Sequence, residues 1–218
     1  MSSLNAKTVK STFKSVPPME AGPYPARIVG VVDMGLQPQF YEKEEKAPAR
    51  EIALTYEFSD EFMLDADGQV QKDKPRWLSE MFPLHNIKNE KAKSTQRYKA
   101  VDPTDTHGGD FAAAINTPIT VTLAVNPNNY NKVMGVAPMR SKDVEKCPPL
   151  VNKPFVFDLA DPDMEVFLKL PKWIQERIKT NLQYNGSKLQ ALIDSGNTVP
   201  GKEPTPSVSK EVDDSNPY

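Results

Sequence analysis

The sequence contains few of the residues from which most active sites are built. Among 218 residues there are one cysteine, Cys147, and two histidines, His85 and His107. A single cysteine excludes an intramolecular disulfide, and we interpret Cys147, which precedes two prolines, as a small structural residue. No Gly-Lys-Ser/Thr phosphate loop and no Gly-x-Ser-x-Gly turn occur. We therefore expect no enzymatic activity, no metal and no cofactor.

Long apolar runs are also missing. No stretch approaches the roughly 20 apolar residues of a membrane-spanning helix, and residues 1–20 lack the apolar core of a signal peptide. These absences predict a soluble protein of the cytoplasm with no membrane partner. The single cysteine agrees with that reducing compartment.

An excess of positive charge is missing too. The chain carries 27 basic and 29 acidic residues, which gives a net charge of -2. This balance argues against a uniformly basic nucleic-acid binder, but a local basic face remains compatible with it.

The sequence does contain short stretches with the alternation of β-strands, divided by 21 prolines. The clearest stretch covers residues 24–36, with Gly30 inside it as a predicted bulge or bend. A polar loop is predicted over 37–50. The next strand, over 50–59, alternates apolar and polar residues, which predicts one buried and one exposed face. Its apolar face consists of Ile52, Leu54, Tyr56 and Phe58.

Further signals complete a β-rich pattern with late helices. An Asp-Gly pair ending at Gly68 marks a hairpin turn, and two strands joined by Pro-Asn-Asn predict a second hairpin over 118–138. A C-terminal helix follows, which Asp161 or Asp163 caps and which Pro171 kinks or divides.

This pattern predicts a mainly β fold with appended helices. Five strands are expected to close into a small OB-fold-like barrel, followed by a C-terminal helix and a disordered acidic tail. A β-sandwich is the competing architecture. We expect a flexible N-terminal arm over 1–20, the OB-fold-like binding domain over 21–185 and a flexible acidic C-terminal tail over 186–218.

Two short polar motifs have both a functional and a structural interpretation. The His-Gly-Gly-Asp motif at 107–110 is either a metal-binding or catalytic fragment or, as we favour, a Gly-rich loop with a helix-capping Asp. The Asp-Ala-Asp-Gly motif at 65–68 has the start of a calcium loop. It lacks the closing Glu, which favours a hairpin turn.

The strongest functional signal is the interleaving of cations with aromatic residues. Proteins bind single-stranded nucleic acid with cations along the phosphates and flat rings under the bases. The alternative for each residue is a solvated charged face or a core aromatic. Arg27 is interpreted as a phosphate contact or as the partner of a buried acid. The other candidate contacts are Phe40, Tyr41, Lys43, Lys46, Arg50, Arg76, Trp77, Lys88, Lys91, Lys93, Arg97, Tyr98 and Lys99.

The C-terminal tail is a second signal. Residues 201–218 hold four acids and two lysines and end on an aromatic residue. Such a tail can dock on basic pockets of partner proteins or compete with nucleic acid for the protein's own basic groove. The alternative is a plain solubilising tail. The candidate docking residues are Glu211, Asp213, Asp214 and Tyr218.

Two segments together carry a resemblance to a known family. The first opens with Gly-x-Tyr-Pro-Ala-Arg and continues through Val-Val-Asp-Met-Gly-Leu-Gln, and the second leads from an aspartate-rich turn through Leu-Pro to a Trp-containing helix. Over roughly residues 21–185 the chain resembles bacteriophage-encoded OB-fold single-stranded DNA-binding proteins. The region over 83–116 departs from that pattern, because it keeps the lysines and lacks a Trp-rich turn. The matching residues are Gly22, Tyr24, Pro25, Ala26, Arg27, Asp33, Gly35, Gln37, Phe167, Leu170, Pro171, Trp173 and Ile174.

The resemblance implies a sequence-tolerant single-stranded DNA-binding protein of phage DNA replication or recombination, acting in the host cytoplasm. Replication or recombination proteins are the expected partners of its tail. The alternative is a phage virion structural or host-interaction protein built on a β-barrel. Lysines of 88–99 that line one groove with Trp77 and Tyr98 would favour DNA binding, and scattered lysines would favour the alternative. The sequence leaves open the choice of DNA or RNA and the oligomeric state, including a homo-oligomer.

Overall fold

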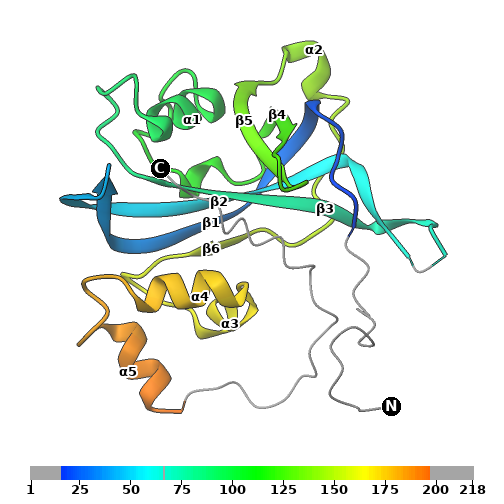
Figure 1. Ribbon diagram of the computed structural model, residues 1–218. Helices are drawn as coiled ribbons and strands as arrows, with labels where there is room; N and C mark the ends of the chain where they lie inside the picture. Colours follow the sequence, from blue (N-terminus) through cyan, green and yellow to red (C-terminus); the bar gives the residue numbers. More distant parts are fainter. Residues whose placement is uncertain (1–15, 66, 197–218) are drawn as a thin grey trace, which may run out of the picture.

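The computed structural model describes residues 16–65 and 67–196, which form one mainly antiparallel β-sheet with short helices on both sides (Figure 1). The strand order is β3-β2-β1-β4-β5, and β6 pairs in parallel with β1. The elements are β1 (Gly22–Tyr41), β2 (Glu44–Leu64), β3 (Val70–Pro83), α1 (Lys93–Val101), η2 (Ala112–Ala114), β4 (Pro118–Val125), β5 (Asn131–Pro138), α2 (Ser141–Val144), β6 (Phe155–Phe157), α3 (Met164–Lys169), α4 (Lys172–Lys179) and α5 (Lys188–Asp194).

The sheet is open rather than closed. Among the described residues, β3 pairs only with β2 and β5 only with β4. The closed five-stranded barrel predicted from the sequence is therefore wrong, whereas the mainly β class with appended helices is confirmed. Strand β1 organises the sheet, because one of its edges pairs with β2 and the other pairs with β4 over 22–27 and with β6 over 30–32.

Each face of the sheet packs against its own core. One core joins the sheet to α1 and η2, above it in Figure 1, and the other joins it to α3, α4 and α5, below it. A bulge between Ile28 and Gly30 shifts the alternation of β1 by one residue. Ile28 and Val31 consequently face the first core, while Val32 faces the second. The predicted irregularity at Gly30 is thus confirmed.

The prediction of a half-exposed β2 is wrong. The predicted apolar face is buried, but the polar residues between are buried as well: Glu51 is 8% and Glu57 is 3% exposed. Residues 147–157 and the late helices cover the face that a two-layer fold would show to water. Alternation within one strand cannot reveal that a segment about 100 residues later will cover its polar side.

The polar loop predicted over 37–50 is also wrong, because β1 and β2 extend through it. They meet at a two-residue turn, Glu42-Lys43, in which both residues have a positive φ, 50° and 68°. Two positive φ values characterise the type I′ turn that matches the twist of the flanking strands. The usual sequence signal for that turn is Asn-Gly, so the turn could not be predicted from the Glu-Lys pair. We call the projecting hairpin over 37–49 the arm.

Several local predictions are confirmed. The Asp-Ala-Asp-Gly motif forms a hairpin turn in which Gly68 has a positive φ. In the His-Gly-Gly-Asp motif, the carboxylate of Asp110 accepts a hydrogen bond from the N–H of Ala112 at the start of η2. Asp163 caps α3, and Pro171 divides α3 from α4.

Two terminal predictions are wrong in part. Within the N-terminal arm predicted over 1–20, Met19 is buried, and its N–H and C=O both pair with the side chain of Asn131 at 2.8 Å. Helix α5 lies within the tail predicted over 186–218, and its Leu189 is fully buried in the second core. Each segment docks through very few contacts, Met19 with Asn131 and Leu189 and Ile193 with the second core, which is too short a pattern to recognise in a polar sequence.

Gly30 makes room for the ring of Phe155. A Cβ at this position would lie 2.2 Å from Phe155 Cζ, so Gly30→Ala must displace the ring or shift β6. We expect the free energy of unfolding to fall by about 1–3 kcal/mol, the usual effect of overpacking, in a urea denaturation. Gly22→Ala is the matched control, since no described heavy atom lies within 4 Å of the Cβ it adds. Equal stabilities of the two variants would contradict this packing.

Candidate nucleic-acid interface

Two aromatic residues at the end of the arm are the most exposed rings in the described part of the chain. Phe40 and Tyr41 are each 57% exposed, and they lie next to the type I′ turn where the arm projects, on the left of Figure 1. Successive residues of a strand point to opposite faces, so the arm presents one ring on each side. Large exposed rings are typical of a binding site, and here each side of the arm has one.

The charges around these rings are mixed. Lys43 lies in the turn, and Lys46 pairs with Glu44 at 2.7 Å on the exposed surface. Residues 42–46 contain three glutamates and two lysines, so the tip of the arm attracts phosphates only weakly. A nucleic acid at the tip would therefore be held by stacking more than by charge.

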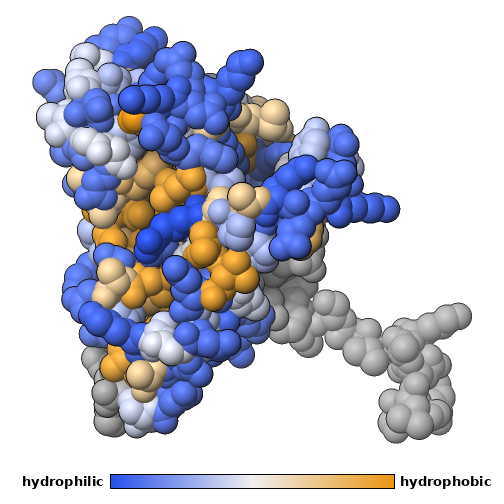
Figure 2. Space-filling view, turned by 90° about the vertical axis from the view of Figure 1, so that its left-hand side faces the viewer, coloured by the Kyte–Doolittle hydropathy of each residue, from blue (hydrophilic) through white to orange (hydrophobic). Residues whose placement is uncertain are grey.

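Apolar and charged residues both lie at the base of the arm. On the side of the molecule where the arm ends, apolar residues gather between two hydrophilic regions (Figure 2). Leu182, which is exposed, donates its N–H to the carbonyl of Leu36 at 2.8 Å. Arg50 forms an ion pair with Asp33. The hydrogen bond from Arg50 to Asp33 raises the pKa of Arg50 against the effect of desolvation.

The loop between β4 and β5 carries another exposed ring, Tyr130, which the sequence analysis did not select. The backbone of Tyr130 pairs with Asn126, whose N–H donates to the Tyr130 carbonyl at 2.8 Å and whose side chain accepts from the Tyr130 N–H at 2.9 Å. Lys132 follows on β5 and is exposed. An aromatic residue placed directly after Pro-Asn-Asn was the available signal.

The side chain of Trp77 contacts other residues of the same chain. Its Nε1 donates to Glu57 Oε2 at 3.0 Å, and its ring centroid lies 6.2 Å from that of Phe155. Glu57 also accepts the N–H of Val151 at 2.7 Å, which ties residues 147–157 to this face of the sheet. Stacking of a base on Trp77 stays a prediction, because the ring is half-buried and only part of it contacts Phe155. Arg76, the adjacent candidate, is half-buried.

Arg27 has neither of its predicted roles. Its guanidinium donates to the carbonyls of Pro148 at 2.7 Å, Asn116 at 2.7 Å and Cys147 at 3.0 Å. These contacts occupy its donors with backbone oxygens rather than with phosphate or a buried acid. Arg27 thus fixes the start of the covering segment against β1.

The cations of α1 turn toward acids. Arg97 Nε lies 2.6 Å from Glu80 Oε1, and Lys93 Nζ lies 2.7 Å from Glu80 Oε2. Although burial favours the neutral acid, the hydrogen bonds and charges of Arg97 and Lys93 hold the pKa of Glu80 below its usual value. Lys99 pairs with Glu90 at 2.8 Å on the surface. Three of the five cations over 88–99 are therefore paired, with two carboxylates between them.

Tyr98 is a core residue. It is 2% exposed, and its hydroxyl donates to Asp102 Oδ2 at 2.9 Å. Burial, together with this acid, raises the pKa of Tyr98 to about 12. The predictions for Arg97 and Tyr98 are wrong, because neither side chain reaches the surface.

Lys88, Tyr98 and Lys99 line one pocket beside Asp102 and Asp105, but the candidates of 88–99 do not line a groove together with Trp77. Lys88 and Lys91 are exposed on the segment before α1, whereas Trp77 lies on the opposite face of the sheet from Tyr98. This scattered arrangement is the one that favours the alternative function. The tail residues Glu211, Asp213, Asp214 and Tyr218 lie outside the described residues.

Comparisons with known proteins found no family model, curated protein or solved structure that matches the chain. In the described ranges, no helix has the length and apolar character to cross a membrane. Within the same ranges, no group of three or more His, Cys, Asp and Glu side chains could hold a metal ion. The candidate interface therefore depends on the geometry of the arm.

Proposed function

We propose that the protein is a non-catalytic single-stranded DNA-binding protein that contacts bases with the aromatic tip of its arm. The observation that carries this proposal is the exposure of Phe40 and Tyr41 at the end of a hydrogen-bonded hairpin. Stacking on an aromatic ring tolerates any sequence, because every base has a π face. From the resemblance to phage proteins we further propose that the protein acts in phage DNA replication or recombination, in the host cytoplasm.

The order of the strands supports the same proposal. An OB fold has its third and fifth strands at the edges of the sheet and a helix between its third and fourth strands. The order β3-β2-β1-β4-β5, with α1 between β3 and β4, follows that plan with the two edges left apart. We therefore propose an open OB-like domain.

OB folds bind single strands with two loops and with the face of their second and third strands. Here the two corresponding loops carry the exposed rings Tyr41 and Tyr130. Residues 147–157 lie over the face of β2 and β3. We propose that the bound strand begins at the tip of the arm and avoids that covered face.

A second candidate function is a protein-binding arm of a phage virion or host-interaction protein. The mixed charge of residues 42–46 and the pairing of the α1 cations with acids favour it, because both reduce the attraction for phosphate. An exposed aromatic pair can also fill an apolar pocket of a protein partner. The two candidates differ in whether an isolated oligonucleotide suffices for binding.

Fluorescence anisotropy with a labelled oligo-dT of about 30 nucleotides, beside a duplex of equal length, separates the two candidates. The proposal predicts binding to the single strand alone, with a shallow dependence on salt. The Lys43→Ala/Lys46→Ala variant should reduce the slope of log K against log salt by about 0.7 per lost contact. Lys72→Ala/Lys74→Ala removes the same charge from β3 and should leave the slope unchanged. Absence of binding at low salt would exclude the proposed function.

A further inference from the structure

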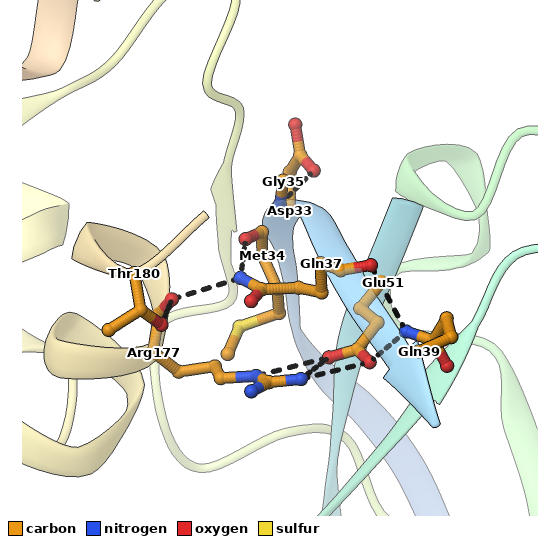
Figure 3. A network of polar contacts seen from close by, with 8 residues as sticks. All are labelled: Asp33, Met34, Gly35, Gln37, Gln39, Glu51, Arg177 and Thr180. Carbon is orange, nitrogen blue, oxygen red and sulfur yellow. Dashed lines mark hydrogen bonds and ion pairs between the residues drawn. The ribbon is translucent and has the colours of Figure 1, made fainter. Parts of the chain in front are cut away.

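A cluster of polar side chains joins the base of the arm to the C-terminal end of α4 (Figure 3). The buried carboxylate of Glu51 accepts hydrogen bonds from Arg177 Nη2, at 2.9 Å to Oε2 and 3.1 Å to Oε1. Gln39 Nε2 donates to the same carboxylate at 2.7 Å. Because the guanidinium contacts both oxygens, it defines the orientation of the pair as well as its distance.

Gln37 makes a second connection between the arm and α4. Its side chain is fully buried, and its Nε2 donates to the carbonyls of Met34 at 2.7 Å and Arg177 at 2.9 Å. Its Oε1 has no hydrogen-bond partner among the described residues, which is unfavourable for a buried acceptor. An apolar side chain would avoid that penalty, but it would lose both bonds of Nε2, including the one to Arg177.

Backbone contacts complete this joint. Besides the bond from Leu182 to Leu36, Gly35 lies so close to the segment after α4 that a Cβ there would be 2.7 Å from Asn181 Cγ. Residues 35–39 are thus held against the end of α4, and residues 40–46 project beyond these contacts. The contacts with the C-terminal part of the chain are thus made at the base of the arm, at Leu36, Gln37 and Glu51.

We propose that Arg177 is a positioning residue for DNA binding: through Glu51 and Gln37 it sets the direction of the arm, and it does not touch the bound strand. This inference rests on the proposed function. Tyr41 lies four residues beyond Gln37, about 13 Å along a strand. A tilt of ten degrees at the base would therefore displace the ring by about 2 Å, more than a binding constellation tolerates.

Arg177→Met tests this role. We expect oligo-dT binding at a temperature well below unfolding to weaken about tenfold, with an unchanged slope against salt because no phosphate contact is lost. In the Phe40→Ala/Tyr41→Ala background the same substitution should have no further effect. Lys169→Met is the matched control, since it removes one positive charge from an exposed ion pair with Glu165 on α3.

The Glu51→Gln/Arg177→Met variant keeps the test valid if Arg177→Met alone fails to fold, because it leaves no unpaired buried charge. It should bind as weakly as Arg177→Met. Wild-type affinity in either variant would overturn the positioning role of Arg177. A shallower dependence of affinity on salt would also overturn it, because it would mark Arg177 as a phosphate contact.

Hydrogen exchange of the amides over 37–46 tests the positioning role of Arg177 separately from the proposed DNA binding, because the measurement needs no DNA. Faster exchange in Arg177→Met supports the positioning of the arm, even if the wild type binds no DNA and only the proposed function fails. Unchanged exchange overturns the positioning.

Discussion

Replacing Glu80 with alanine should lower the free energy of unfolding by about 3–5 kcal/mol, the usual effect of removing one partner of a buried ion pair. The Glu80 carboxylate is 8% exposed and accepts hydrogen bonds from Arg97 and from the hydroxyl of Tyr56. Its loss leaves the buried guanidinium of Arg97 without its charge partner. A urea denaturation curve measures the effect.

The control for this prediction is Glu165→Ala, which breaks the exposed pair with Lys169. That substitution should change stability by no more than about 0.5 kcal/mol. A similarly small change in Glu80→Ala would contradict the buried network.

The same network predicts a pH dependence. The pKa of Glu80 is lower in the folded protein than its usual value of 4.5, so the folded state binds fewer protons at this carboxyl than the unfolded chain. Its contribution to stability is present above the usual value and is lost as the pH falls through the folded value. Stability measured from neutral pH down into that range should fall less steeply in Glu80→Gln than in the wild type.

Phe40→Ala/Tyr41→Ala should weaken binding to oligo-dT about a hundredfold. Each stacked base is worth about 1–3 kcal/mol, and both rings are lost together. Because the two side chains are exposed, the melting temperature should stay close to that of the wild type. Anisotropy titrations at constant salt, together with thermal unfolding, measure both quantities.

The matched control lies at the end of the other long hairpin. Leu64 and Val70 are exposed apolar residues that pair across β2 and β3, and Leu64→Ala/Val70→Ala should leave the affinity unchanged. A loss of less than about threefold in the arm variant would contradict stacking at its tip. An equal loss in both variants would show that any exposed apolar residue contributes in the same way.

Much of the fold was predictable because it depends on local signals. The bulge at Gly30, the turn ending at Gly68, the cap at Asp163 and the break at Pro171 each follow from one residue type in one place. The sequence also predicts the exposed aromatic pair, Phe40 and Tyr41, although it predicts a loop where the structure has a hairpin. A residue whose effect comes from its own backbone conformation, such as Gly or Pro, can be recognised from the sequence without knowing its neighbours in the fold.

The rest depends on partners that lie far along the chain. Arg97 and Lys93 look like a basic face until Glu80 is placed beside them. Trp77 looks fully available for stacking until Glu57 and Phe155 are placed against it. Charge and aromatic patterns do not state which face of an element is buried, because burial is decided by tertiary packing.

Ultraviolet cross-linking of the full chain to oligo-dT, followed by mass-spectrometric mapping, tests the central claim most directly. The account predicts cross-links at Phe40 and Tyr41, with Tyr130 as a second position and none at Trp77. Cross-links confined to residues 88–99 would contradict it, because the bound strand would then follow the lysines rather than the arm.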